Sequence, residues 1–193
     1  MSNKSTRVCP WQHDWGLDNW VRRLIQNPYK ILGGYIEEGQ TVLDLGCGPG
    51  VFSIAMAELV GEKGRVISVD IQDEMLQMLK QKSEQMGLES RIQIHKSQPD
   101  KIGISEKVDF ALAFYMIHEV PNKESLLSEV ATILNPEGKF LIVEPKIHVS
   151  KSSFEETINM AQSASLRPIS RPNIVFSRTV LLQRNSAQKI GIL

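Results

Sequence analysis

The chain has 193 residues, of which 41% are hydrophobic, and this length and apolar content suit one domain with a single core. Its 22 basic and 22 acidic residues give a net charge of zero, so the basic surface of a nucleic-acid-binding protein is not expected. We therefore expect a small-molecule partner and no nucleic acid.

The N-terminal segment and the cysteine content are typical of a cytoplasmic protein. The first 15 residues contain no apolar stretch of a secretion signal, and no window approaches the roughly 18 apolar residues of a membrane helix. Cys9 and Cys47 lie in neither a Cys-x-x-Cys pair nor a Cys/His cluster with zinc-ligand spacing. We expect a reduced, cytoplasmic chain without a membrane span or a metal, and its oligomeric state, monomer or homodimer, stays open.

The first predicted unit is a strand, a glycine turn and a helix. Residues 41–46 (TVLDLG) are rich in Leu and β-branched residues and suit a buried strand, and residues 51–61 (VFSIAMAELVG) place apolar residues at helical spacing. A second strand is predicted over residues 64–71 (GRVISVDI). A second helix follows over residues 72–87 (QDEMLQMLKQKSEQMG) and ends at Gly87.

The next segment continues this alternation with one shortened connection. Residues 91–97 alternate apolar and polar side chains as a third strand, and the longer apolar run over residues 107–117 predicts a fourth. The stretch between them, residues 98–106 (QPDKIGISE), is too short and too rich in Pro and Gly for a full helix. We expect this crossover to be abbreviated.

The C-terminal part is predicted to contain two helices, a fifth strand and a closing hairpin. Residues 122–145 supply a helix, a turn at 136–138 and then the fifth strand. Residues 152–166 predict another helix, and the runs around residues 171–177 and 178–184 could form two strands that pair as a hairpin.

This order of elements predicts an α/β fold. Parallel neighbouring strands need crossover connections, and these connections are nearly always right-handed. The expected architecture is therefore a doubly wound, mostly parallel, seven-stranded sheet with a C-terminal antiparallel hairpin.

Three glycines, Gly46, Gly48 and Gly50, follow the first strand, where a doubly wound sheet binds its ligands. Glycine permits positive φ and close approach of a ligand to the backbone, and the next helix offers free N–H groups. Alone, this pattern could be a tight strand-to-helix turn. Asp70, 20 residues after Gly50, favours a ligand, because a carboxylate at the second strand end can accept hydrogen bonds from ribose hydroxyls. Asp73 is the better candidate for capping the following helix.

A nicotinamide dinucleotide is the alternative ligand for this loop. Its fingerprint, Gly-x-Gly-x-x-Gly, needs a third glycine where this chain has Val51. Asp44, two residues before the first glycine, would also lie next to the pyrophosphate. The carboxylate of Asp44 suits a cationic ligand better.

Three segments, "VLDLGCGPG", "VISVDI" and "LNPEGKFLIVEP", resemble the signature segments of class I S-adenosylmethionine-dependent methyltransferases, and in particular the small-molecule type of the ubiquinone/menaquinone methyltransferase group. The resemblance implies S-adenosylmethionine as methyl donor, S-adenosylhomocysteine as product and a small-molecule acceptor. It divides the chain into a Trp-rich helical lid or extension (residues 1–35), a methyltransferase domain (36–184) and a tail (185–193). A non-catalytic S-adenosylmethionine-binding or regulatory module would share the glycine loop and is the alternative.

The resemblance also implies a set of cofactor-binding residues. The glycine loop would lie against the methionine part of the cofactor with Asp44 near the ammonium group, Asp70 would bind the ribose and Ile71 would lie against adenine. Gln98 stands where the family often has an acid for the adenine amino group, and Asp100 is a neighbouring substitute. The complete expected set is Asp44, Gly46, Cys47, Gly48, Gly50, Asp70, Ile71, Gln98 and Phe114.

The candidate catalytic residues Tyr115, His118 and Glu119 follow the fourth strand on the cofactor side. Methyl transfer is an in-line displacement, and a base is needed only if the acceptor must lose a proton. Related enzymes frequently carry structural histidines at this position. For His118, a role in packing or loop anchoring is therefore favoured over that of a general base.

Two acceptor classes are disfavoured. Methyltransferases of nucleobase or glutamine amines carry Asn/Asp-Pro-Pro-Tyr after the fourth strand, where this chain reads FYMI, and the "NPYK" motif at residues 27–30 precedes the glycine loop. Arsenite methyltransferases bind arsenic through several thiolates, and this chain has two cysteines.

All three tryptophans, Trp11, Trp15 and Trp20, lie in the first 20 residues. Packing of an amphipathic helix on the domain is the favoured interpretation. A lid that excludes water from the site and an interfacial contact with a membrane, suited to a lipophilic acceptor, are the alternatives.

Overall fold

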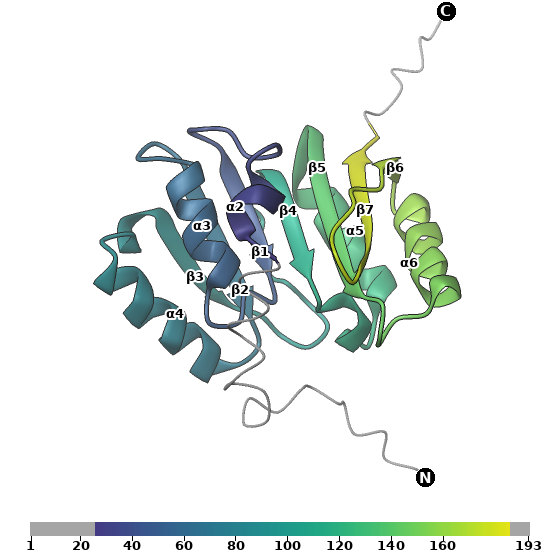
Figure 1. Cartoon of the computed structure of the whole chain (residues 1–193), viewed down its shortest axis with the longest axis horizontal. Coiled ribbons are helices and arrows are strands. Elements are labelled where there is room, and N and C mark those ends of the chain that lie inside the picture. The colour runs from purple at the N-terminus through teal and green to yellow at the C-terminus, as the bar shows by residue number, and fades with distance from the viewer. Residues whose placement is uncertain (1–25, 186–193) are drawn as a thin grey trace, which may run out of the picture.

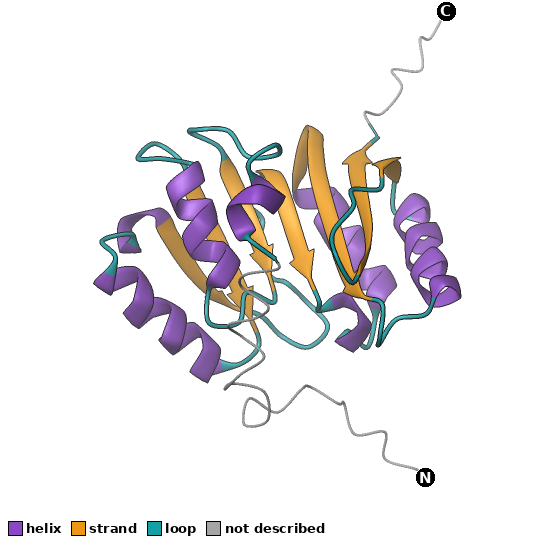
Figure 2. Cartoon of the chain, viewed as in Figure 1, coloured by secondary structure: helices purple, strands orange, loops and turns teal. Residues whose placement is uncertain are grey.

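The computed structural model describes residues 26–185, in which a seven-stranded sheet lies between two layers of helices (Figures 1 and 2). The strands are β1 (Thr41–Leu45), β2 (Arg65–Asp70), β3 (Ile92–Lys96), β4 (Val108–Phe114), β5 (Leu134–Pro145), β6 (Leu166–Ser170) and β7 (Ser177–Arg184). The helices are α2 (Pro28–Leu32), α3 (Val51–Leu59), α4 (Asp73–Gln85), α5 (Lys123–Ile133) and α6 (Lys151–Ser163), with short 3₁₀ helices η1 (Glu89–Arg91) and η2 (Ile117–Glu119).

The strand order β3-β2-β1-β4-β5-β7-β6 confirms the predicted doubly wound topology. Strands β1 to β5 are parallel, and β7 runs antiparallel between β5 and β6. The order reverses between β1 and β4, where Leu45 pairs with Val69 of β2 on one side and Ala113 of β4 on the other. Because these strands end at nearly the same level, the loops that follow them emerge side by side.

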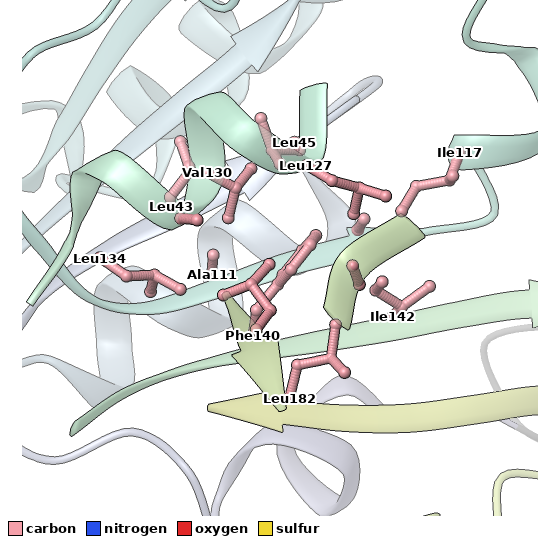
Figure 3. Packing of buried hydrophobic residues seen from close by; sticks show 14 of the residues in the cluster. Leu43, Leu45, Ala111, Ile117, Leu127, Val130, Leu134, Phe140, Ile142 and Leu182 are labelled. Carbon is pink, nitrogen blue, oxygen red and sulfur yellow. The ribbon is translucent and has the colours of Figure 1, made fainter. Parts of the chain in front are cut away.

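The core divides between the two faces of the sheet. One face packs against α2, α3 and α4, and the other packs against α5 and α6. Figure 3 shows the buried apolar residues on the face that packs against α5 and α6, where Leu127 and Val130 of α5 lie over Ala111 and Phe140 of the sheet. Strands β1 and β4 are buried on both faces, which explains why their sequences are continuous apolar runs without alternation.

The predicted hairpin is present, but one of its strands was misplaced. The strand expected over residues 171–177 is a loop, and β6 lies upstream at Leu166–Ser170, beyond a helix that ends at Ser163 and not at residue 166. Only Leu166 of β6 is buried, so this short edge strand carries no alternating pattern. Ser165, with φ of +66°, turns the chain between helix and strand.

Two other element boundaries differ from the expectation. The fourth strand ends at Phe114 and not at residue 117, because Tyr115 has φ of +59° and the chain turns into η2. The turn predicted at residues 136–138 lies inside β5, where a register shift and φ of +65° at Glu137 absorb the extra residues. The abbreviated third crossover is confirmed, with one isolated bridge between Gln98 and Lys101 and no helix.

Several predictions fall on residues outside the described range. Residues 1–25 and 186–193 are not described, so the tryptophan segment with Trp11, Trp15 and Trp20 stays a prediction, as does the tail. In the "NPYK" motif, Asn27 caps α2 by accepting from the N–H groups of Tyr29 and Lys30. None of the helices in residues 26–185 is long and apolar enough to cross a membrane.

Candidate functional site

The glycine loop emerges from β1 and lies against the loop that follows β4. A Cβ added to Gly46 would lie 2.9 Å from Cβ of Met116, and one added to Gly50 would lie 2.3 Å from Cδ1 of Leu79 in α4. Packing therefore explains these two glycines. Gly48 differs, since an added Cβ would meet nothing within 4 Å although φ is +51°. The backbone at Gly48 faces open space, as a loop that receives a ligand would.

Asp70 connects the glycine loop to the loop after β2. Its Oδ2 accepts from the N–H of Gly48 and its Oδ1 from the N–H of Gln72, both at 2.9 Å. The side chain is 8% exposed, and each carboxylate oxygen retains a further lone pair. The expected cap at Asp73 is wrong: α4 begins at this residue, which pairs with Lys96 of β3.

Asp44 lies in β1 at the bottom of the glycine loop and is 2% exposed. Its Oδ2 accepts from the hydroxyl of Ser53 at 2.6 Å, and that hydroxyl accepts in turn from Ser68 at 2.9 Å. Burial, with a smaller contribution from the charge of Asp70, raises the pKa of Asp44 to about 7 against the opposing effect of the Ser53 hydrogen bonds. A cation beside Asp44 would restore its ionised form.

The backbone of Cys47 closes the glycine turn. Its N–H donates to the carbonyl of Val69 at 3.0 Å, and its carbonyl accepts from the N–H of Gly50 at 3.0 Å. The side chain is 7% exposed, and burial together with the charges of Asp44 and Asp70 raises the pKa of the thiol. A thiolate ligand for arsenic is therefore disfavoured.

The remaining predicted cofactor residues lie at or after the ends of β2, β3 and β4. Ile71 and Phe114 are half-buried at the ends of β2 and β4, and the Phe114 ring packs 4.3 Å from the Phe52 ring of α3. Gln98 is exposed, and its backbone N–H bonds the carbonyl of Lys101 at 3.0 Å. These three side chains flank the strand ends that carry Asp44 and Asp70.

Tyr115 is held by residues far from it in the sequence. Its hydroxyl lies 2.6 Å from Oγ of Ser177 and accepts from Nε2 of Gln26 at 2.6 Å. Gln26 also donates to the carbonyl of Val175 at 3.3 Å, and its own Oε1 is buried without a partner among the described residues. The Tyr115 hydroxyl thus connects the start of the described chain to β7.

His118 contacts two carboxylates after β4. Its Nδ1 lies 2.5 Å from Oε2 of Glu144, a residue of β5 that is 2% exposed. Oε1 of Glu144 accepts from the N–H of Ile117 at 2.9 Å. Nε2 of His118 lies 3.9 Å from Oε1 of Glu119. The hydrogen bond to Glu144 raises the pKa of His118, and burial opposes this rise.

Comparison with known proteins decides the family. Residues 36–186 match the family described as "Methyltransferase domain". The chain belongs to this family. A crystal structure of an S-adenosylmethionine-dependent methyltransferase from Aquifex aeolicus superposes with a TM-score of 0.77 at 26% identity, over 85% of this chain and 93% of that one.

Curated relatives match this methyltransferase domain over part of their length. The demethylmenaquinone methyltransferase of Oceanobacillus iheyensis is 29% identical over 109 residues, which are 56% of this chain and 46% of the relative. The ubiquinone/menaquinone biosynthesis C-methyltransferase of Klebsiella pneumoniae is 31% identical over 110 residues, 56% of this chain and 44% of the relative. The matched segment thus spans about half the length of these relatives.

Two residues of the candidate site were not selected from the sequence. Glu144 is an acid inside the apolar run "FLIVEP", and this interruption of a buried strand is a signal that could have identified it. Gln26 carries no comparable signal, because its contacts with Tyr115 and Ser177 depend on the fold. Within residues 26–185, no cluster of three His, Cys, Asp or Glu side chains suits a metal ion.

Proposed function

We propose that this protein transfers a methyl group from S-adenosylmethionine to a small-molecule acceptor. The observation that carries the proposal is the pair of buried acids, Asp44 and Asp70, on two sides of a glycine loop whose Gly48 faces open space. Family membership and the seven-stranded topology support the same activity. When bound, the sulfonium of the donor would supply an activated methyl group.

Each part of the donor has a matching group at the strand ends. The ammonium of the methionine part would pair with Asp44, whose buried carboxyl has a pKa of about 7 and gains from a cation. The ribose hydroxyls would bond the free lone pairs of Asp70, and adenine would lie between Ile71 and the loop that carries Gln98. Gly46, Cys47, Gly48 and Gly50 would cradle the methionine part with their backbone.

The acceptor would lie beyond β4 and β5, on the side of Tyr115, His118 and Glu119. Three exposed apolar side chains border this side: Ile147 (88% exposed), Val175 (50%) and Phe176 (67%). The N–H of Lys146 donates to the carbonyl of Phe176 at 3.0 Å, so the two loops that carry them are neighbours. An apolar rim favours a lipophilic acceptor, and a quinol ring of the kind that the names of the relatives indicate is the first to test.

The tryptophan segment would close over this acceptor side as a lid. Gln26, the first described residue, bonds Tyr115 and the carbonyl of Val175 and thus lies at the apolar rim. We place the protein in the cytoplasm, with contact at a membrane surface through the same rim.

Binding and turnover test the proposal in sequence. Calorimetry with S-adenosylhomocysteine should give a binding signal, and product formation should exceed the no-acceptor background with at least one acceptor from a panel of hydroquinones, phenols, amines and thiols. Absence of binding would overturn the proposal. Binding without turnover of any acceptor would point to the non-catalytic module instead.

A further inference from the structure

The pair formed by His118 and Glu144 defines the protonation state of the histidine. Glu144 approaches from β5, and its two oxygens receive the N–H of Ile117 and Nδ1 of His118. A carboxylate flanked by two donors is an acceptor at both oxygens, so Nδ1 of neutral His118 carries the hydrogen. The lone pair of the imidazole is therefore on Nε2.

Nε2 is available to a ligand in this arrangement. Its neighbour Oε1 of Glu119, at 3.9 Å, is beyond hydrogen-bond distance. The His118 side chain is 21% exposed, whereas that of Glu144 is 2% exposed. Buried Glu144 thus holds the His118 ring through Nδ1, and the ring itself reaches the surface.

The pair lies next to the loop that is proposed to hold the methyl donor. Met116, whose Cβ would be 2.9 Å from a Cβ at Gly46, immediately precedes η2, which contains His118. Glu144 follows Val143, which pairs with Phe114 at the end of β4. The glycine loop, Met116 and the His118–Glu144 pair therefore occupy one continuous edge of the sheet.

We propose that His118 removes a proton from the methyl acceptor through Nε2, and that Glu144 is the positioning residue that holds the required tautomer. This inference rests on the proposed function and adds the acceptor class to it. The acceptor is a group that gives up a proton when it is methylated, such as the phenolic hydroxyl of a phenol or a hydroquinone. A tertiary amine or a thioether needs no base and does not need this pair.

The proposed step balances in atoms and charge. The bond between hydrogen and the nucleophilic atom of the acceptor breaks, and the proton goes to Nε2. The electron pair left on that atom forms the new bond to the methyl carbon, while the carbon–sulfur bond breaks and its electron pair stays on sulfur. Glu144 stabilises the resulting imidazolium through the hydrogen bond to Nδ1.

The charged and titratable groups that face His118 come from β5, η2, α5 and the loop after β5. Glu144 of β5 and Glu119 of η2 raise the pKa of His118, and Lys123 of α5 lowers it. The ring of His148, in the loop after β5, lies 5.9 Å from the His118 ring. A base with a raised pKa accepts the proton of a weakly acidic acceptor more readily, and turnover should rise with pH as His118 loses its own proton.

Nitrogen NMR of the imidazole rings tests the pair without any acceptor. We expect neutral His118 in wild type as the Nδ1–H tautomer. In Glu144→Gln the side-chain amide would donate to Nδ1, so we expect the Nε2–H tautomer and a lower pKa. His118→Asn identifies the His118 signals, and His148→Asn, which removes the neighbouring ring, should leave the His118 tautomer unchanged. A wild-type His118 in the Nε2–H form would overturn the proposal, even if Glu144→Gln did not fold.

Turnover with the acceptor found in the panel completes the test. His118→Asn should lower kcat by about 10²- to 10⁴-fold with little change in KM for the donor, and Glu144→Gln should lower kcat and shift the pH profile. Full activity of His118→Asn would refute the base. Calorimetry with S-adenosylhomocysteine separates the failure of the proposed function from the failure of this inference. Absence of binding to wild type refutes the proposed function. Binding to a wild type in which His118 is the Nε2–H tautomer refutes only the proposed role of His118 and Glu144.

Discussion

Replacing Asp44 by Asn should stabilise the unliganded protein while it weakens the proposed site. Asp44 is 2% exposed, and burial together with the charge of Asp70 disfavours its ionised form. The pKa of Asp44 is therefore raised to about 7 from the ordinary value of 3.8. In the unfolded chain the carboxyl is solvated and ionises near the ordinary value. Asn keeps an oxygen that can accept from Ser53 and carries no charge to desolvate.

The size and sign of the effect follow from linkage. Between about pH 4 and pH 7 the folded state retains a proton that the unfolded state has lost, so the free energy of unfolding of wild type falls as the pH rises. The interval of about three pH units, at about 1.4 kcal/mol each, corresponds to about 4 kcal/mol. The advantage of Asp44→Asn should therefore grow from near zero at about pH 4 to about 4 kcal/mol at pH 7 and above. In a chain of this size that is roughly 8–16 °C in melting temperature.

Urea unfolding of both proteins at several pH values measures this difference. Asp100→Asn, at an exposed position in the loop after β3, controls for the change in net charge and should show no such growth with pH. If the free energies of unfolding of wild type and Asp44→Asn differ by the same amount at about pH 5 and at about pH 8, the argument from the buried charge is refuted.

The same chemistry gives four further predictions. The affinity for S-adenosylhomocysteine should rise from about pH 5.5 to pH 8, because Asp44 is protonated below about 7 and a neutral carboxyl cannot pair with the ammonium; calorimetry showing a flat affinity would contradict this. Gly48→Ala should fold with a loss of about 1 kcal/mol from its positive φ and bind the ligand more weakly. Gly50→Ala should lose the same amount and about 1–3 kcal/mol more, because its Cβ would lie 2.3 Å from Leu79, and equal melting temperatures would contradict this contrast. Asp70→Asn should weaken binding of both S-adenosylhomocysteine and 5′-methylthioadenosine about 10- to 100-fold, whereas Asp44→Asn should weaken only the former, which carries the ammonium. Because all three tryptophans lie in residues 1–20, intrinsic fluorescence isolates the proposed lid, and its emission should shift to shorter wavelength with ligand and acceptor; an unchanged spectrum would count against closure.

The parts of the fold that could be predicted are those in which one local pattern decides the structure. Strands β1 and β4 are buried on both faces and read as continuous apolar runs, and the glycine loop follows the first of them. Strand β6 could not be found in this way. It lies at the edge of the sheet with one buried residue, Leu166, and its pairing with β7 is made by the backbone, which leaves no mark on the side-chain pattern.

In the candidate site, too, the residues marked by a local sequence pattern could be predicted and the contacts made by the fold could not. Asp44 and Asp70 could be selected because each ends or nearly ends a strand at a fixed distance from the glycines. For His118 the sequence favoured packing or loop anchoring over catalysis, and it gave no sign of the contact with Glu144, which is 26 residues away and reaches His118 only because β4 and β5 are neighbours. Likewise, the interpretation of Asp73 as a cap failed because α4 begins one residue earlier than a cap at Asp73 requires, so that Gln72 is the N-cap residue.

The three buried acids at the carboxyl edge of the sheet differ in how the protein compensates their charge, and this difference indicates where a ligand is required. Asp70 accepts from two backbone N–H groups, and Glu144 accepts from one backbone N–H and a histidine. Among the described residues, Asp44 accepts hydrogen bonds from Ser53 alone, and burial still outweighs these hydrogen bonds. A charge that is left undercompensated in the free protein lowers stability, and it gains most from a cation supplied from outside. Asp44 is therefore the acid at which binding of an ammonium group should change the stability of the fold most.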